Sequence, residues 1–191
     1  MTTPIDLPSH LPVHHVVLVD ASGFIFRAFH GIQILTRPDG TPVNAVYGFI
    51  TMLMKLLDDM QPDHIAIIFD TARKTFRNEI DPSYKANRTE PPEELVPQFA
   101  LVREATQAFN LDCIELAGFE ADDLIATYTK EAINEGAEVT IVSSDKELMQ
   151  LVTDRVTMFD SFKNRRIGPE QVQDKFGVYP EKVVDVQSLA G

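Results

Sequence analysis

Two short, nearly continuous apolar runs rich in β-branched residues constrain the fold more than any other feature of the sequence. They read VHHVVLVD (13–20) and HIAIIFD (64–70), and each ends in an aspartate. Runs of this length and composition are typical of strands buried on both faces of a parallel sheet. Between them, residues 42–60 carry apolar side chains at helical spacing. Together they predict one strand, helix, strand unit.

The same alternation continues along the rest of the chain. We expect helices over 92–109, 120–134, 145–152, 169–176 and 180–190, and strands over 111–116, 138–145 and 155–160. Two of these helices open with proline in the first turn, where its missing N–H costs nothing. Alternation of this kind predicts an α/β sandwich, and 191 residues with 44% apolar content suit one domain spanning 1–191.

Segment 71–92 does not follow the alternation, because it is polar, contains Pro82, Pro91 and Pro92, and has no apolar face. We expect an exposed excursion from the sheet. The net charge of −12 would by itself argue against nucleic-acid binding, since phosphate contacts need Lys and Arg. Residues 73–88, however, hold five basic residues against two acidic ones. The excursion is therefore a candidate phosphate-binding element.

No segment has the roughly 18 consecutive apolar residues that a membrane helix needs, and the amino terminus does not look like a signal peptide. The single cysteine, Cys113, supports neither a disulfide framework nor a cysteine-rich zinc site. We expect a cytoplasmic protein without membrane contact.

Acidic residues stand where one edge of the predicted sheet should lie. Asp20, Asp70 and Asp145 each close a predicted strand, and the stretch GFEADDLIAT places three more acids where a helix begins. Because ligands bind beyond the carboxyl ends of parallel strands, we expect these side chains to converge there. The predicted cluster consists of Asp20, Asp70, Glu120, Asp122, Asp123, Asp145 and Glu147.

Acids in a first helical turn have a simpler explanation, because each gains about 0.3–1 kcal/mol from the helix dipole. Strand-end aspartates can likewise act only as caps of the following helices, as Asp20 could for ASGFIFRAF. Two carboxylates about 5 Å apart, however, repel by about 3 kcal/mol at an effective dielectric near 20. Several such pairs favour a bound cation, and oxygen ligands suit Mg²⁺ or Mn²⁺.

Five motifs in a fixed order resemble the 5′-nuclease domain of bacterial DNA polymerase I, which is related to flap endonucleases and to PIN-domain nucleases. They are VDASGFIFRAFH, FDTARKTFRNEIDPSYKANR, GFEADDLIAT, VSSDKELMQLV and GPEQVQDKFGVYPEKVVDVQSLAG. The resemblance runs nearly end to end. It implies a PIN-like three-layer sandwich with a mainly parallel central sheet and an exposed basic arch over 71–92.

The resemblance also implies a set of site residues. Catalytic roles fall to Lys85, Asp20 and Asp70, with Lys85 contacting the scissile phosphate. Two Mg²⁺ or Mn²⁺ ions are expected in the complete domain, the first arranged by Asp20, Asp70, Glu120, Asp122 and Asp123 and the second by Asp145 and Glu147. DNA contacts are expected from Arg73, Lys74, Arg77, Tyr84, Lys85 and Arg88. The alternative for Tyr84 is packing at the base of the arch, and for Lys74 and Arg77 a solvated loop.

Two features depart from the family's pattern. Asp145-Lys146-Glu147 stands where the family usually shows Asp-Lys-Asp. The sequence also stops at LAG, where the family continues into further acids and a helical hairpin that grips duplex DNA. We therefore expect the chain alone to be weak or inactive.

The function implied is metal-dependent hydrolysis of DNA from the 5′ end and at 5′ flaps, in replication and repair. The expected partners are DNA ends, flaps and branched duplexes, with a polymerase fused downstream and a monomeric state. Two alternatives remain open. One is a catalytically silent DNA-binding or scaffold module, and the other is a PIN-type ribonuclease.

Overall fold

A computed structural model describes residues 14–71, 74–87, 89–190 of the chain and is built around a single six-stranded sheet. The strand order is β3-β2-β1-β4-β5-β6. All neighbours pair in parallel except β5 and β6, which are antiparallel. The strands are β1 (His15–Asp20), β2 (His64–Ile68), β3 (Asp112–Ile114), β4 (Glu138–Val142), β5 (Val156–Asp160) and β6 (Arg165–Ile167).

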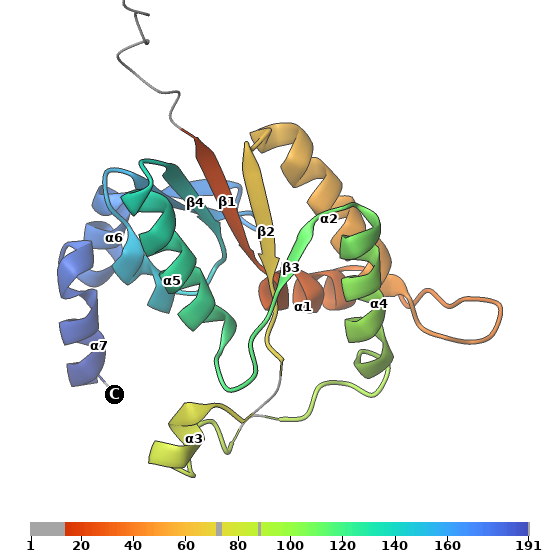
Figure 1. Cartoon of the computed structure of the whole chain (residues 1–191). Helices are drawn as coiled ribbons and strands as arrows, with labels where there is room; N and C mark the ends of the chain where they lie inside the picture. Colours follow the sequence, from red (N-terminus) through yellow and green to blue (C-terminus); the bar gives the residue numbers. More distant parts are fainter. Residues whose placement is uncertain (1–13, 72–73, 88, 191) are drawn as a thin grey trace, which may run out of the picture.

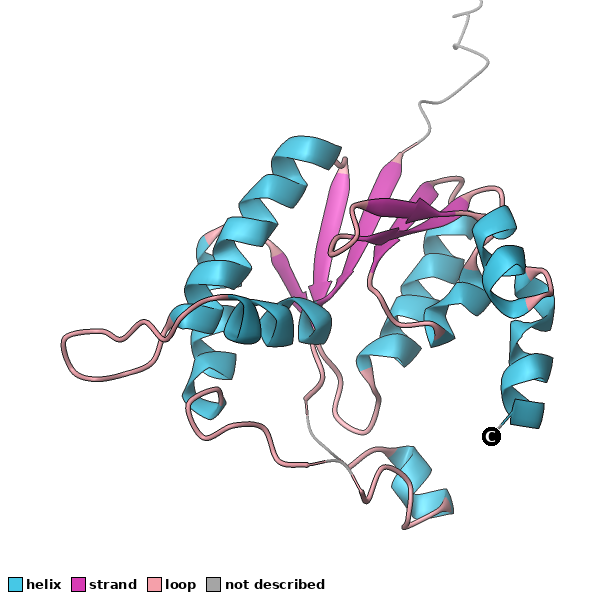
Figure 2. Ribbon diagram, turned by 180° about the vertical axis from the view of Figure 1, so that it is seen from behind, coloured by secondary structure: helices cyan, strands magenta, loops and turns pink. Residues whose placement is uncertain are grey.

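Helices cover both faces of the sheet and make three layers (Figures 1 and 2). One face carries α1 (Ala21–Gly31), α2 (Asn44–Met60) and α4 (Val96–Ala108). The other carries α5 (Ala121–Asn134), η1 (Glu147–Leu151), α6 (Pro169–Phe176), η2 (Pro180–Lys182) and α7 (Val183–Ala190). The predicted PIN-like sandwich with a mainly parallel sheet is confirmed.

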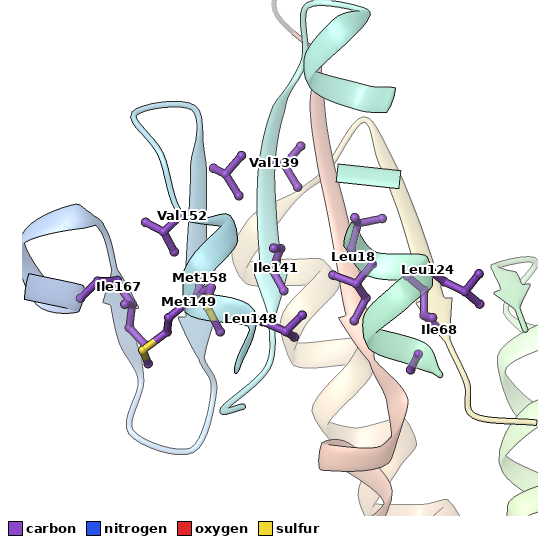
Figure 3. Packing of buried hydrophobic residues seen from close by; sticks show 14 of the residues in the cluster. Leu18, Ile68, Leu124, Val139, Ile141, Leu148, Met149, Val152, Met158 and Ile167 are labelled. Atoms are coloured by element: carbon purple, nitrogen blue, oxygen red, sulfur yellow. The ribbon is translucent and has the colours of Figure 1, made fainter. Parts of the chain in front are cut away.

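Alternation along the central strand divides the core into two hydrophobic clusters. Val17 and Val19 of β1 pack into the cluster beneath α1, α2 and α4, whereas Leu18 packs into the cluster beneath α5. Figure 3 shows Leu124 of α5 beside Leu18 and Ile68 of the neighbouring strands. Both faces are therefore apolar, which explains the continuous apolar runs in the sequence.

The strand order places β1 and β4 at the point where the chain changes direction across the sheet. From β1 the chain proceeds through β2 to β3 on one side, then crosses to β4 and proceeds through β5 to β6 on the other. The crevice beyond the carboxyl ends of such a strand pair is the usual ligand site of open α/β sheets. Asp20 ends β1, and Ser143 directly follows β4.

We call residues 71–92 the arch. Its described part holds the short helix α3 (Phe76–Ile80) and a series of turns, and Figure 1 shows α3 set apart from the sandwich, beyond the carboxyl ends of β1 and β2. Thr75 forms an isolated parallel bridge with Gly118, and Phe76 N donates to Gly118 O at 2.9 Å. The arch is thus attached to the loop that precedes α5.

Several elements differ from the expectations. Strand β2 ends at Ile68 and β4 at Val142, so Asp70 and Asp145 follow these strands and do not close them, and the helix expected over 145–152 is the 3-10 helix η1. Helix α1 was considered only as the segment that Asp20 could cap, and Asp20 does accept a hydrogen bond from Ser22 N at 3.0 Å. Helix α3 and strand β6 were not predicted, because five and three residues are too few to set a periodicity.

Within the described residues, no helix is both long and apolar enough to cross a membrane.

The contact between α1 and α2 leaves no room for a side chain at Gly48. A Cβ there would lie 2.8 Å from Ala28 Cβ and 3.2 Å from Ala28 Cα. We expect Gly48→Ala to lower the free energy of unfolding, because overpacking costs about 1–3 kcal/mol and exceeds the gain in helix propensity of about 1 kcal/mol. Gly31→Ala is the matched control, since nothing lies within 4 Å of its added Cβ. Urea denaturation that finds both variants equally stable would contradict this packing.

Candidate active site

Two serines connect three acids at the carboxyl edge of the sheet, where Asp20 ends β1 and Asp70 and Asp145 follow β2 and β4. Asp20, which is 9% exposed, accepts hydrogen bonds from Ser22 N at 3.0 Å and from the Ser143 hydroxyl at 2.9 Å. The Ser22 hydroxyl donates to Asp70 Oδ2 at 2.8 Å, and Ser143 Oγ accepts from Asp145 N at 3.0 Å. The carboxyl ends of β1, β2 and β4 are thereby joined into one rim.

Asp122 enters this rim from the first turn of α5. The helix is held there because Asp70 Oδ1 accepts a hydrogen bond from Ala121 N at 2.8 Å. Burial raises the pKa of Asp122 to about 7, and the neighbouring carboxylates of Asp20, Asp145, Asp70 and Glu147 add to the rise. The carboxylate of Asp122 accepts no hydrogen bond from any group in the described part of the chain. Five carboxylates therefore influence one another at this point.

The other two acids of the motif face the arch. Asp123 receives two hydrogen bonds from the Arg77 guanidinium, at 2.8 and 2.7 Å. Glu120 accepts from Lys85 Nζ at 2.8 Å and from the Tyr84 hydroxyl at 3.2 Å, and it lies 3.7 Å from Arg77 Nη1. Arch cations thus compensate these two acids, although 35 or more residues separate the partners in sequence.

The pKa shifts reflect this division. The hydrogen-bonded Arg77 guanidinium lowers the pKa of Asp123, and Asp123 in turn raises the pKa of Arg77. Burial raises the pKa of Asp20 even though the Ser143 hydroxyl opposes that rise. The charges of Asp20 and Asp122 are therefore unfavourable without a compensating cation, whereas the charge of Asp123 is already stabilised.

The donor set at the rim suits a hard divalent cation. Its members are carboxylate oxygens with hydroxyl support, the ligands that Mg²⁺ and Mn²⁺ prefer. Within the described residues, no three acidic, histidine or cysteine side chains are close enough to form a ready-made metal site. Small rotations of exposed carboxylates such as Asp70 and Glu147 would be needed to coordinate an ion. Attraction to the cation would drive these rotations, because the cation would offset the repulsion at Asp122.

A pocket of about 1020 Å³ separates the arch from the sandwich. Lys74, Tyr84 and Lys85 line it from the arch, and the acids Asp70 and Glu120 line it from the rim. The wall opposite the arch belongs to α1 and α4 and includes Ser22, Ile25, Phe26, His30, Phe99 and Arg103. The arch side of the pocket therefore carries two lysines beside Glu90, the opposite side carries aromatic rings beside Arg103, and Asp70 and Glu120 lie at its end.

The remaining predicted residues lie as follows. Asp145 Oδ1 accepts from Glu147 N at 2.8 Å, and Glu147 begins η1 with an exposed side chain. Lys74 is exposed in the pocket wall. Arg73 and Arg88 lie outside the described residues. Lys85 adopts a left-handed backbone with φ of 55°, a conformation that non-glycine residues rarely adopt and that tends to mark functional sites.

Several residues of the site were not predicted. Ser22 and Ser143 lie two residues after Asp20 and two before Asp145, and hydroxyls so close to strand-end acids could have been recognised. Phe26 and Phe99 come from helices distant in sequence, and their rings lie 6.3 Å apart with an edge-to-face tilt. Nothing local distinguishes these two from core aromatics, although Phe26 is 40% exposed.

Comparison with known proteins identifies related sequences. The family model described as 5′-3′ exonuclease, N-terminal resolvase-like domain, matches residues 15–177. DNA polymerase I of Rhizobium leguminosarum is 58% identical over 185 residues, which make up 93% of this chain and 18% of that protein. The chain thus spans less than a fifth of the length of this relative.

Solved structures share the fold at lower identity. The T5 D15 protein co-crystallised with metal ions has a TM-score of 0.77 and 21% identity, and the match covers 93% of this chain and 66% of that chain. The bacteriophage T5 D15 flap endonuclease in a pseudo-enzyme-product complex with DNA and metal ions has a TM-score of 0.73 and 20% identity, with the same coverage. Both likenesses concern the fold.

Asp122 makes stability depend on pH. Its pKa is about 7 in the folded chain and 3.8 in the unfolded chain, so the folded state binds more protons between about pH 4 and 7. The free energy of unfolding must then fall as pH rises through that range, and Asp20 acts in the same direction. Without metal, Asp122→Asn should therefore exceed the native chain in stability at pH 8 by at least about 1 kcal/mol, or about 2–4 °C in Tm.

Thermal unfolding in a chelator between pH 5 and 8 measures this difference. The exposed Asp154, which precedes β5 at the opposite edge of the sheet, supplies the control Asp154→Asn. Parallel profiles for the native chain and Asp122→Asn would show that the predicted crowding of carboxylates is absent.

Proposed function

The chain belongs to the family of 5′-3′ exonuclease N-terminal, resolvase-like domains, and we propose from this that its rim and arch cleave DNA phosphodiesters at 5′ ends and 5′ flaps. The observation that carries the proposal is the arrangement of five mutually repelling carboxylates beside a pocket with a cationic wall. Metal-dependent phosphodiester hydrolysis needs acidic side chains that hold the metal and positive charge that binds the phosphate.

We propose that the metal lies among Asp20, Asp70, Asp122, Asp145 and Glu147. Their convergence on Asp122 supports this placement, and Mg²⁺ or Mn²⁺ best fits their oxygen atoms. Metal held there would supply an activated water and would stabilise the leaving oxygen of an in-line displacement. Ser22 and Ser143 would keep Asp20, Asp70 and Asp145 oriented toward the same point.

Lys85 is proposed to contact the scissile phosphate. It already lies in the pocket beside the rim, where its ammonium group binds Glu120 at 2.8 Å. A phosphate that enters the pocket can take over this ammonium, because the two anions compete for one cation. Lys85 would then add positive charge where the transition state accumulates negative charge.

The pocket is proposed to hold the single-stranded end of the substrate. Lys74 and Lys85 would hold phosphates from the arch side, whereas Phe26 and Phe99 offer aromatic surface on the sandwich side. Tyr84 forms a cation–π contact with Lys85, whose Nζ lies 5.1 Å from the ring centroid. This contact keeps open both roles expected for Tyr84, stacking on a base and packing within the arch.

We further propose the cellular setting that the family suggests. Residues 1–191 would form one nuclease domain of a longer, monomeric protein with a polymerase, acting in the cytoplasm on nicked and branched DNA. The relative from Rhizobium leguminosarum, of which this chain covers only 18%, supports the fusion. The activity of such a longer protein would depend on parts beyond residue 191.

The direct test is cleavage of a 5′-flap DNA in Mg²⁺ or Mn²⁺, by this chain and by a version extended into the region that follows in its relatives. We expect the longer protein to cut the flap strongly and this chain weakly. Asp122→Ala should reduce the rate at least about 100-fold, and Lys85→Ala by about 10²–10³ because it removes a group that stabilises developing charge. Lys130→Ala, on the exposed side of α5, is the matched control.

The other outcomes identify the rival functions. Tight flap binding without hydrolysis in either protein, unaffected by Asp70→Ala, would favour the catalytically silent module. Faster cleavage of a single-stranded RNA than of the flap DNA would favour the PIN-type ribonuclease.

A second cationic element flanks the rim and is proposed to contact duplex DNA. Lys163, Arg165 and Arg166 are exposed on the β5–β6 hairpin, and none has an acidic partner within 4.0 Å in the described part of the chain. The carboxylate of Asp160, at the start of the turn, is buried and accepts hydrogen bonds from the backbone N–H groups of Phe162 and Lys163. Since β5 is two strands from β1, the hairpin starts roughly 10 Å from the end of β1.

Replacing all three hairpin cations with alanine should weaken duplex binding and flatten its salt dependence. The slope of log K against log salt should fall by about 2–3, at about 0.9 per lost phosphate contact. Fluorescence anisotropy with a blunt duplex measures this slope. Lys130, Lys175 and Lys182, all exposed on α5, α6 and η2, provide a charge-matched triple alanine control. Equal slopes for the two triple variants would exclude the hairpin as a phosphate contact.

A further inference from the structure

We propose that Asp123 is the anchor of the arch, which it holds through Arg77, and that it is not a metal ligand. This role goes beyond the proposed function but rests on it, since it concerns how the arch is held over the nuclease site. It makes Asp123 a positioning residue.

The contact between Asp123 and Arg77 has the geometry of a two-pronged pair. Arg77 Nη1 donates to Asp123 Oδ2 at 2.8 Å, and Nη2 donates to Oδ1 at 2.7 Å. Parallel bonds of this kind are the strongest and most directional that a carboxylate forms with a side chain. The Asp123 side chain is 22% exposed and that of Arg77 30%, so water screens the pair only in part.

The oxygen atoms of Asp123 have little capacity left for a metal ion. Besides the two bonds from Arg77, Oδ2 accepts a third hydrogen bond from Glu120 N at 3.0 Å. Asp122 differs in every respect, because its carboxylate has no hydrogen-bond donor within the described residues. Neighbouring positions on an α-helix point about 100° apart. One acid of the pair therefore faces the rim while the other faces the arch.

The contact between Asp123 and Arg77 also helps to position Lys85, through α3. Arg77 belongs to α3, and Asn78, the next residue, donates from Nδ2 to Tyr84 O at 3.0 Å. Tyr84 immediately precedes Lys85, whose left-handed backbone requires support. The chain of contacts thus runs from Asp123 through Arg77 and Asn78 to the proposed phosphate-binding lysine.

Aromatic packing supports the same attachment point. The Arg77 guanidinium lies 4.6 Å from the Phe76 ring centroid, and Phe76 packs against Phe119 with centroids 5.6 Å apart. Together with the bridge between Thr75 and Gly118, these contacts form the base of the arch. Among the described residues, Asp123 is the only acid whose two carboxylate oxygens both bind one arginine of the arch.

The test compares Asp123→Asn with Asp122→Asn in two measurements on the whole chain. Calorimetric titration with Mn²⁺ should show affinity unchanged within about twofold for Asp123→Asn and reduced at least about tenfold for Asp122→Asn. Amide hydrogen exchange over 74–87, without metal, should be at least about tenfold faster in Asp123→Asn and Arg77→Ala, with Asp122→Asn unchanged. The reversed pair, Arg77→Asp with Asp123→Arg, should restore part of the protection.

Each outcome of these two measurements either supports or overturns the proposed role of Asp123 as the anchor of the arch. Equal loss of Mn²⁺ affinity in the two asparagine variants, or unchanged exchange over 74–87 in Asp123→Asn, would overturn the anchor. If no variant and not even the native chain binds Mn²⁺, the proposed metal site fails, while the exchange measurement still tests the anchor. Arg77→Lys, which keeps the charge but removes the fork, serves for the same comparison if Arg77→Ala does not fold.

Discussion

The carboxyl edge of this structure depends on how acids that the fold forces together are compensated. Parallel strands necessarily end at one edge, so Asp20, Asp70 and the residues after β4 meet wherever the sheet forms. Their repulsion is relieved in three different ways. Serine hydroxyls donate hydrogen bonds to Asp20 and Asp70, and arch cations neutralise Glu120 and Asp123. Asp122 has neither kind of partner, and its raised pKa favours the protonated, uncharged form.

The acids at the start of α5 therefore have two different roles. Because consecutive helix positions diverge, acids adjacent in sequence serve different neighbours, the rim for Asp122 and the arch for Asp123. The helix start therefore couples the proposed chemistry to the element that would bind the substrate. A rim without an arch would lack counter-charges for Glu120 and Asp123, and an arch without this helix would lack its attachment.

Most of the framework was predictable because it follows from local periodicity. Buried strands such as β1 and β2 read as apolar runs, and acids at their ends share an edge in any parallel sheet. Three kinds of feature were not predictable. Short elements such as β6 and α3 set no period, the pairing of Arg77 with Asp123 spans 46 residues, and the wall made by Phe26 and Phe99 exists only after α1 and α4 pack together. The sequence showed which residues carry charge, but only the folded chain shows which charges meet.

Hydrogen bonds tie the start of the arch to two other parts of the sandwich. Asp70, where the arch leaves β2, accepts through its carbonyl a hydrogen bond of 2.8 Å from Arg103 of α4, the helix to which the arch returns. The Thr71 hydroxyl also donates to Leu116 O at 3.1 Å. With its base fixed by these bonds, the exposed part of such an insertion can be lengthened, shortened or rewritten without shifting a strand. The sequence of the arch can therefore vary, apart from the residues that pair with Glu120 and Asp123, while the carboxylates of the rim stay in place.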